Sequence, residues 1–250
     1  MEKYFGISYE FDKAVVLNTI DRFARAKHKG YVCVADGVTL SMSQNYSLLR
    51  EVLEGADIVT CDSGWVPLFL KWIYGIKREQ LSGSELFSSI LHKKKYKMMF
   101  LGTSNAILKP LREKISEIDP RILDMPFLSL PFRAVEDFDY KKIADSINEE
   151  NPDIVWVALG MPKQEIFMYY LKPYLNRGIC IGIGATFKFY SGLSGHRRAP
   201  RWMIQCKIEW IYRILSEPKK QIGRCWLIFK TVPKLLYSEY KLKKAKNVQR

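Results

Sequence analysis

The feature that most constrains the fold of this chain is a series of short apolar runs, rich in β-branched residues, that alternate with stretches of helical periodicity. The apolar runs are residues 31–35, 57–61, 97–102, 122–128, 153–160 and 179–184, and the helical stretches are 46–56, 104–118, 140–150 and 165–176. This alternation predicts an α/β fold, in which a mainly parallel sheet is covered by helices on both faces. In such folds ligands bind beyond the carboxyl ends of the strands.

Length, cysteine usage and hydropathy narrow the class of protein. A chain of 250 residues with 48% hydrophobic residues is long enough for one large domain with a sizeable core. Its five cysteines are scattered and form no CxxC pair, which argues against a disulfide framework or a structural zinc site and fits a reducing cytoplasm. We find no signal peptide, and no uncharged apolar run of the ~20 residues that span a bilayer.

Positive charge is concentrated towards the C-terminus. The chain has a formal net charge of +14, and residues 197–250 hold 15 Lys or Arg against three acids. We therefore divide the chain into an α/β core at residues 1–196 and a basic helical appendage at residues 197–250, in which a helix is expected over 199–215. Such a charge asymmetry indicates an anionic partner: nucleic acid, phospholipid or a phosphorylated ligand.

The last part of the appendage alternates bulky apolar residues with Lys and Arg, and it is interrupted by Pro218, Gly223 and Pro233. This pattern is typical of an amphipathic element that lies on a membrane surface. The alternative is an ordinary terminal helix that packs on its own domain.

The stretch VALGMPKQE, residues 157–165, predicts a strand end, a turn and a helix start. Gly160 suits close approach in the turn, and Pro162 suits the first turn of a helix. The N-terminus of a helix favours anions, and Lys163 and Gln164 would add a charge and a hydrogen-bonding amide at that point. A solvated first turn explains the pattern equally well.

Six segments then follow one another over roughly residues 30–225: ADIVTCDSG, GSELF, VALGMPKQE, GIGATF, SGLSGHRRAPRWM and IEWIYRILSEPKK. In order and spacing they resemble the WecG/TagA/CpsF glycosyltransferases, glycosyltransferase family 26. The resemblance implies a bacterial, inverting enzyme with a Rossmann-like core that uses no metal or other cofactor. It also implies peripheral association with the cytoplasmic face of the cell membrane, and it leaves the oligomeric state open, a homo-oligomer included.

The reaction implied by this resemblance moves a sugar, of the N-acetylmannosamine or the glucose type, from a UDP-sugar to a polyprenyl-diphosphate-linked sugar during envelope or capsular polysaccharide synthesis. Asp62, a few residues past the Ala56-Asp57 pair, matches the position of the family's presumed catalytic base. The chemistry suits this role, because a carboxylate at a strand end can take the proton of the attacking acceptor hydroxyl. An inverting transfer needs one such base and no covalent partner. Without the resemblance, Asp62 is explained as the cap of a turn before Gly64.

The chain departs from the family at two positions. The family's Thr-x-Asn motif falls on Val34-Ala35-Asp36, so that Asp36 replaces the asparagine. We expect Asp36 to hydrogen-bond a substrate or to share the proton-accepting role with Asp62. In GATFKF, Lys188 replaces an aspartate that is common in the family, which changes the edge of the donor pocket.

The remaining substrate-binding assignments also follow from the resemblance. Gln164 matches the glutamine expected to contact the nucleotide or the sugar, in a donor pocket lined by Gly160, Lys163 and Gly184. In the appendage, the cations expected to offset the charge on the leaving UDP are Arg213, Lys219, Lys220 and Arg224. A lysine acts there as a point charge, whereas arginine binds phosphate through two parallel hydrogen bonds. Three further arginines, Arg197, Arg198 and Arg201, serve either the donor pocket or the surface.

Rival interpretations rest on shorter patterns. Asp137-Phe138-Asp139 is a DxD motif, which in other glycosyltransferases holds a divalent metal, but an aspartate before Tyr140 also suits the cap of a helix. The basic, aromatic-rich tail suggests a nucleic-acid-binding protein, although no helix-turn-helix, RRM or zinc pattern is present. The enzyme interpretation expects no nucleic acid among the partners. GIGATF lacks the full GxGxxG context of a dinucleotide enzyme.

Overall fold

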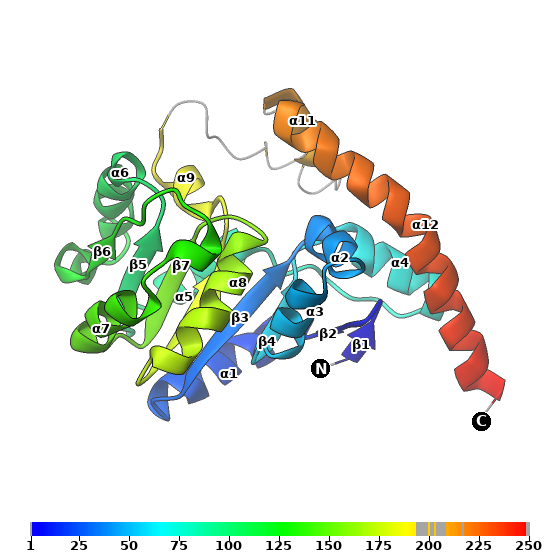
Figure 1. The fold of residues 1–250 in the computed structure, drawn as a ribbon, viewed down its shortest axis with the longest axis horizontal. Helices are drawn as coiled ribbons and strands as arrows, with labels where there is room; N and C mark the ends of the chain where they lie inside the picture. The colour runs from blue at the N-terminus through cyan, green and yellow to red at the C-terminus, as the bar shows by residue number, and fades with distance from the viewer. Residues whose placement is uncertain (1, 194–199, 201–202, 204–208, 217, 249–250) are drawn as a thin grey trace.

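A parallel sheet with the strand order β4-β3-β8-β7-β5-β6 forms the centre of the molecule in a computed structural model, which describes residues 2–193, 200, 203, 209–216 and 218–248 (Figure 1). Its strands are β3 (Lys29–Ala35), β4 (Ile58–Cys61), β5 (Met98–Gly102), β6 (Phe127–Leu128), β7 (Ile154–Ala158) and β8 (Gly178–Gly182). Every neighbouring pair in this sheet is parallel. A separate antiparallel hairpin pairs β1 (Glu2–Tyr4) with β2 (Ile7–Tyr9).

Helices connect the strands and continue into the basic C-terminal part. They are α1 (Lys13–Arg25), α2 (Gly37–Ser43), α3 (Ser47–Glu54), α4 (Trp65–Tyr74), α5 (Gly83–Leu91), α6 (Asn105–Ser116), α7 (Tyr140–Glu150), α8 (Lys163–Leu171), α9 (Thr186–Tyr190), α11 (Glu209–Ser216) and α12 (Pro218–Val248). Short 3-10 turns occur at Pro120–Asp124, Val135–Asp137 and Lys172–Tyr174.

Each face of the sheet has its own hydrophobic cluster in the described part of the chain. Because side chains alternate along a strand, Cys33 and Val155 pack against α3, α7 and α8, whereas Val32 and Ile154 pack against α1, α5 and α6. Burial on both faces is the reason why the strands are near-continuous apolar runs. The predicted α/β, Rossmann-like fold is confirmed, and Cys33, Cys61 and Cys180 are buried free thiols, as the apolar runs indicate.

Two predicted elements differ from the structure. The strand expected over 122–128 is limited to Phe127–Leu128, because Asp119 accepts a hydrogen bond from the Arg121 N–H and Pro120 opens a 3-10 turn that holds Ile122. The helix expected over 165–176 begins at Lys163 and ends at Leu171, where a 3-10 turn that contains Pro173 follows. Of the helix expected over 199–215, the structure describes mainly the part in α11.

The long helix α12 packs along the core. The Thr231 hydroxyl donates to Ser41 Oγ on α2 at 2.7 Å, and the buried carboxylate of Glu239 accepts from the Phe5 N–H at 2.8 Å and the Tyr74 hydroxyl at 2.7 Å. Contrary to the expected interruptions, the helix continues through Gly223 and Pro233. Within the described ranges, no helix is both long enough and apolar enough to cross a bilayer.

Candidate functional site

The neighbouring strands β3 and β4 end side by side, and each is followed at once by an aspartate. Ala35 pairs with Cys61, and the Asp62 N–H donates to the Ala35 carbonyl at 2.9 Å. Asp36 and Asp62 therefore leave the same edge of the sheet, where β3 leads into α2 (Figure 1). Both line a cavity of about 110 Å³, which we call the carboxylate cavity and define by Asp36, Asp62, Gln164, Gly184 and Arg224.

The first of these carboxylates is the N-terminal cap of α2. Asp36 Oδ1 accepts hydrogen bonds from the Val38 N–H at 3.0 Å, the Thr39 N–H at 2.8 Å and the Thr39 hydroxyl at 2.9 Å. A carboxylate in this position also benefits from the partial positive charge of the helix start. The sequence change to Asp36 is thus accommodated by local structure.

Asp62 is not the residue that caps the following helix. At the start of α4, Ser63 Oγ accepts from the Trp65 N–H at 3.3 Å and from the Val66 N–H at 3.4 Å. Ser63 thus caps the start of α4, and the half-buried Asp62 side chain, which makes interactions of its own, lines the carboxylate cavity.

The amide of Gln164 is fixed at the start of α8. Its Oε1 accepts from the Gly184 N–H at 2.9 Å, its Nε2 donates to Glu165 Oε1 at 2.9 Å, and the side chain is buried. A Cβ at Gly182 would lie 3.1 Å from Gln164 Nε2, so a side chain there would crowd the amide. The prediction of a solvated first turn is therefore wrong for Gln164, which joins two loops at the cavity.

Glu165 is a residue that the sequence analysis missed. Its side chain is fully buried, and its Oε2 has no hydrogen-bond partner among the residues that the structure describes. Burial, with a smaller contribution from the charge of Asp36, raises its pKa to about 7, although the hydrogen bond from Gln164 and the charge of Arg224 act in the opposite direction. The sequence signal was weak, because Glu165 follows Lys163 and Gln164 in a polar first turn of the helix.

A second, larger cavity of about 840 Å³ adjoins the first, because the two share Gly160 and Gly184. We call it the outer cavity. Gly160 has a φ of +78°, a conformation that favours glycine, and nothing lies within 4 Å of where its Cβ would be, so the turn rather than close approach requires the glycine here. Lys188, the predicted change at the pocket edge, lines this outer cavity.

Lys163 lies in the wall of the outer cavity. Its ammonium lies 5.2 Å from the ring centre of Phe132 and 5.0 Å from that of Phe138, and it donates to the carbonyl of Arg133. Sequence reasoning did not identify the polar residues Thr103, Ser104 and Asn105, which line the same cavity. Their signal was their position directly after the strand predicted over 97–102.

The motifs GSELF and GIGATF meet at the carboxylate cavity. The hydroxyls of Ser84 and Thr186 lie 3.2 Å apart, and a Cβ at Gly83 would lie 3.5 Å from the backbone of Ile183. Segments about a hundred residues apart in sequence thus share one wall of the cavity.

The predicted cations of the appendage are only partly brought to this site. Arg224 of α12 lines the carboxylate cavity, whereas Lys219 is exposed in the first turn of α12. Arg213 and Lys220 lie on α11 and α12, but their side chains are outside the described part of the structure. The same holds for the whole of Arg197, Arg198 and Arg201.

The DxD motif forms a helix start. Asp139 caps α7 by accepting a hydrogen bond from the Lys142 N–H at 2.9 Å, and the carbonyl of Asp137 accepts from Arg133 at 3.2 Å. The capping interpretation of Asp139 is confirmed. Within the described ranges, no three or more His, Cys, Asp or Glu side chains gather in a way that could hold a metal ion.

Comparison with known proteins agrees with the order of the motifs. The sequence matches the model of the Glycosyl transferase WecG/TagA/CpsF family over residues 3–247. It is 28% identical over 197 residues to the N-acetylglucosaminyldiphosphoundecaprenol N-acetyl-β-D-mannosaminyltransferase of Bacillus spizizenii, which covers 78% of this chain and 72% of the relative. The enzyme of the same name from Bacillus subtilis is 28% identical over 200 residues, with 79% and 73% covered. The Staphylococcus aureus enzyme is 23% identical over 255 residues, with 96% and 94% covered. The chain therefore belongs to the WecG/TagA/CpsF family of glycosyltransferases.

Proposed function

We propose that this glycosyltransferase moves a sugar from a UDP-sugar to polyprenyl-diphosphate-linked N-acetylglucosamine in the synthesis of a bacterial envelope polysaccharide. The observation that carries the proposal is that Asp62, Gln164 and Arg224 line one cavity at the carboxyl ends of the strands. The relatives are named as N-acetylmannosaminyltransferases that act on N-acetylglucosaminyldiphosphoundecaprenol. Their names favour an N-acetylmannosamine-type donor over a glucose-type donor.

Asp62 is the base in this proposal. It accepts the proton of the acceptor hydroxyl while that oxygen bonds to the anomeric carbon from the face opposite UDP, and UDP leaves with the electrons of the broken bond. We assign this step to Asp62 because it matches the family's presumed base and lines the cavity, whereas Asp36 caps the start of α2. Asp36 then acts as the second carboxylate of the cavity and holds the shape of its rim.

The charge that develops on the leaving diphosphate needs positive partners. Arg224 lines the cavity and can form two parallel hydrogen bonds to phosphate. The N-terminus of α8 adds backbone N–H groups and a partial positive charge, and Lys163 stands in its first turn. These groups supply the electrostatic stabilisation of a metal-independent transfer.

The outer cavity is the proposed site of the nucleotide. Its volume of about 840 Å³ lies in the range typical of small-molecule sites. A nucleotide there would direct its sugar past Gly160 and Gly184 towards Asp62, because the two cavities adjoin at these glycines. Lys188 then faces the nucleotide side of the donor, where it would favour additional negative charge.

The basic appendage at residues 197–250 is proposed to hold the enzyme peripherally on the cytoplasmic face of the membrane, where a lipid-linked acceptor lies. Its sequence carries a large excess of Lys and Arg, and the α12 part alternates these residues with aromatic ones.

The direct test is transfer from a panel of UDP-sugars to a short-chain prenyl-diphosphate N-acetylglucosamine acceptor in the presence of EDTA. We expect turnover with a UDP-N-acetylmannosamine-type donor, and its loss in Asp62→Asn. Turnover that requires added Mn²⁺ or Mg²⁺ would contradict the metal-independent mechanism and would direct attention to Asp137 and Asp139. Absence of both turnover and UDP binding, together with salt-sensitive RNA binding, would reject the proposed function.

A further inference from the structure

Helix α4 exposes bulky apolar side chains on the face turned away from the core. Trp65, Leu68 and Trp72 are 45%, 47% and 76% exposed, and their spacing places them on one stripe of the helix. The opposite side of α4, with Leu70 and Ile73, is buried in the core. Because α4 already has an apolar core face, this second apolar face is not needed for packing within the domain.

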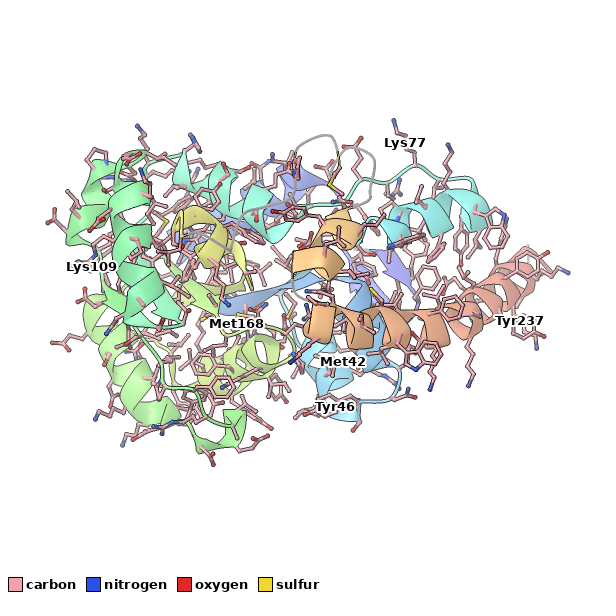
Figure 2. All side chains as sticks on the ribbon, turned by 90° about the horizontal axis from the view of Figure 1, so that it is seen from above. Met42, Tyr46, Lys77, Lys109, Met168 and Tyr237 are labelled. Carbon is pink, nitrogen blue, oxygen red and sulfur yellow. The ribbon has the colours of Figure 1, made fainter. Side chains whose placement is uncertain are left out.

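Helix α12 repeats this arrangement. Leu235 and Glu239 are buried against the core, whereas Trp226, Phe229 and Tyr237 are 59%, 73% and 61% exposed. Tyr240 is also exposed, and these residues lie on the side of the helix opposite to its buried residues. Figure 2 shows Tyr237 near one end of the molecule, with Lys109 near the other.

The two helices run side by side in the same direction. Near the start of α4, a Cβ built on Gly37 would lie 3.4 Å from Ile228 of α12 and 3.6 Å from Ser63. At the end of α4, the Tyr74 hydroxyl donates to Glu239, and Lys243 Nζ donates to the carbonyl of Ile73. The exposed stripes therefore belong to neighbouring elements. We call them together the α4–α12 surface and define it by Trp65, Leu68, Trp72, Trp226, Phe229, Tyr237 and Tyr240.

The exposed charged side chains of the two helices that carry this surface are positive. The sequence of α4 contains Lys71 and no acid, and that of α12 contains nine Lys or Arg and a single acid, Glu239, which is buried. Lysines also lie over the exposed rings of α12, with Lys230 at 5.1 Å from the ring centre of Trp226 and Lys241 at 4.7 Å from that of Tyr237. Aromatic rings with ammonium groups beside them match the apolar and anionic layers of a lipid headgroup region.

We propose that the α4–α12 surface docks on an anionic phospholipid bilayer, so that a helix of the core, and not the appendage alone, contacts the membrane. Trp and Tyr are the residues enriched at the membrane interface, and each Lys near anionic lipid adds to the attraction. A second copy of this chain is a poorer occupant, because two faces that carry only positive charge repel each other.

Docking through α4 has a consequence for the active site. Trp65 follows Asp62 by three residues, so insertion of this stripe would hold the mouth of the carboxylate cavity at the level of the headgroups. The diphosphate of a lipid-linked acceptor lies at that level. This consequence rests on the proposed function, whereas the docking itself does not.

The test measures binding of the full chain to vesicles of phosphatidylcholine with and without phosphatidylglycerol, by cosedimentation. We expect binding that requires phosphatidylglycerol, and a loss of roughly tenfold or more in the double variant Leu68→Gln, Trp72→Gln. The control is Leu123→Gln, because the exposure of Leu123, at 56%, lies between those of Leu68 and Trp72, but the residue is on the Pro120–Asp124 turn. Circular dichroism verifies that all variants are folded.

Two further measurements separate the outcomes. Quenching of the wild-type tryptophan fluorescence by brominated lipid would support insertion of the surface into the bilayer. Unchanged vesicle binding of the α4 double variant would overturn the proposal. A wild type that is dimeric by light scattering, beside a monomeric α4 variant, would instead identify the surface as a contact between copies and reject the proposal.

Turnover of the short-chain acceptor in solution should be unchanged in the α4 variant. If wild-type turnover is absent while vesicle binding behaves as expected, the proposed function fails and the docking stands.

Discussion

The two ends of β4 each carry an aspartate, and the structure uses these aspartates in opposite ways. Asp57, before the strand, accepts hydrogen bonds from His28 Nε2 at 2.8 Å, the Tyr31 N–H at 3.0 Å and Lys172 Nζ at 3.1 Å. Asp62, after the strand, faces a cavity together with Arg224. Four residues of buried strand separate a carboxylate within an ion-pair network from one that lines the carboxylate cavity.

The pKa shifts at the amino-terminal and carboxyl ends of the sheet point in opposite directions. Burial raises the pKa of Asp57, but the hydrogen bonds from His28, the Tyr31 N–H and Lys172 outweigh it, so that the net pKa is lowered. At the other end, burial raises the pKa of Glu165 to about 7. The charge of Asp57 at the amino-terminal end of the sheet thus stabilises the fold, whereas the charge of Glu165 at the carboxyl end is kept at a cost, a pattern that is common at functional sites.

The largest expected effect comes from the aspartate at the functional end. Asp62→Asn removes the proposed base and should lower kcat by about 10²–10⁴-fold with little change in thermal stability. Steady-state kinetics with the short-chain acceptor measures it, and Asp57→Asn is the matched control that should retain turnover. Equal losses of kcat in the two variants would break the distinction between the ends of the strand.

Glu165 tests whether the carboxyl end of the sheet stores an electrostatic cost. Since its folded pKa lies above that of a free carboxyl, the folded protein binds more protons between about pH 4.5 and pH 7, and its stability falls as the pH rises through that window. The variant Glu165→Gln lacks this penalty. Its free energy of unfolding relative to the wild type should therefore grow by about 3 kcal/mol from the lower to the upper limit.

Urea unfolding of both proteins over this pH range measures the difference, and subtraction removes the titration of the other groups. A difference independent of pH would mean that Glu165 is ionised in the folded protein throughout. In that case the two ends of the sheet would be electrostatically alike.

Arg224 tests the positive side of the functional end. Arg224→Ala should lower kcat about 10²-fold because a charge partner of the leaving diphosphate is lost, and Arg224→Lys should recover part of that loss as a point charge. Inhibition by the product UDP should weaken in parallel. An Arg224→Ala variant with wild-type kinetics would mean that Arg224 of α12 takes no part in catalysis, and that only residues of the core do.

How far the sequence could predict these two ends depends on the range of the interactions involved. Local pattern showed that Asp36 and Asp62 each come directly after an apolar run, and parallel pairing brings these two strand ends together. Their selection as site residues came from the resemblance to the family and not from the local pattern. The burial of Glu165 did not, because an acid in the first turn of a helix usually indicates a solvated face. Its position against Cys33 and Asp36 is set by tertiary packing.

Long-range contacts also explain the other differences. In α12, Glu239 binds the core through Phe5 and Tyr74, which lie 234 and 165 residues away in sequence. No local pattern encodes such a contact. The failure at Ile122 is of the opposite kind, because there the local cap by Asp119 and the proline that follows it override the strand propensity of an apolar run.

The smallest expected effect is at the structural end. Asp57→Asn removes the charge but not the shape of a half-buried acceptor that binds His28 and Lys172, so it should lower the free energy of unfolding by about 1–2 kcal/mol at neutral pH and leave kcat unchanged. Because the folded pKa of Asp57 is lowered, its contribution is present above the pKa of the unfolded chain, and it is lost as the pH falls through the folded value. The variant and the wild type should thus converge in stability in acid. A loss that persisted there would assign the effect to packing rather than charge, and the contrast between Asp57 and Asp62 would become one of geometry alone.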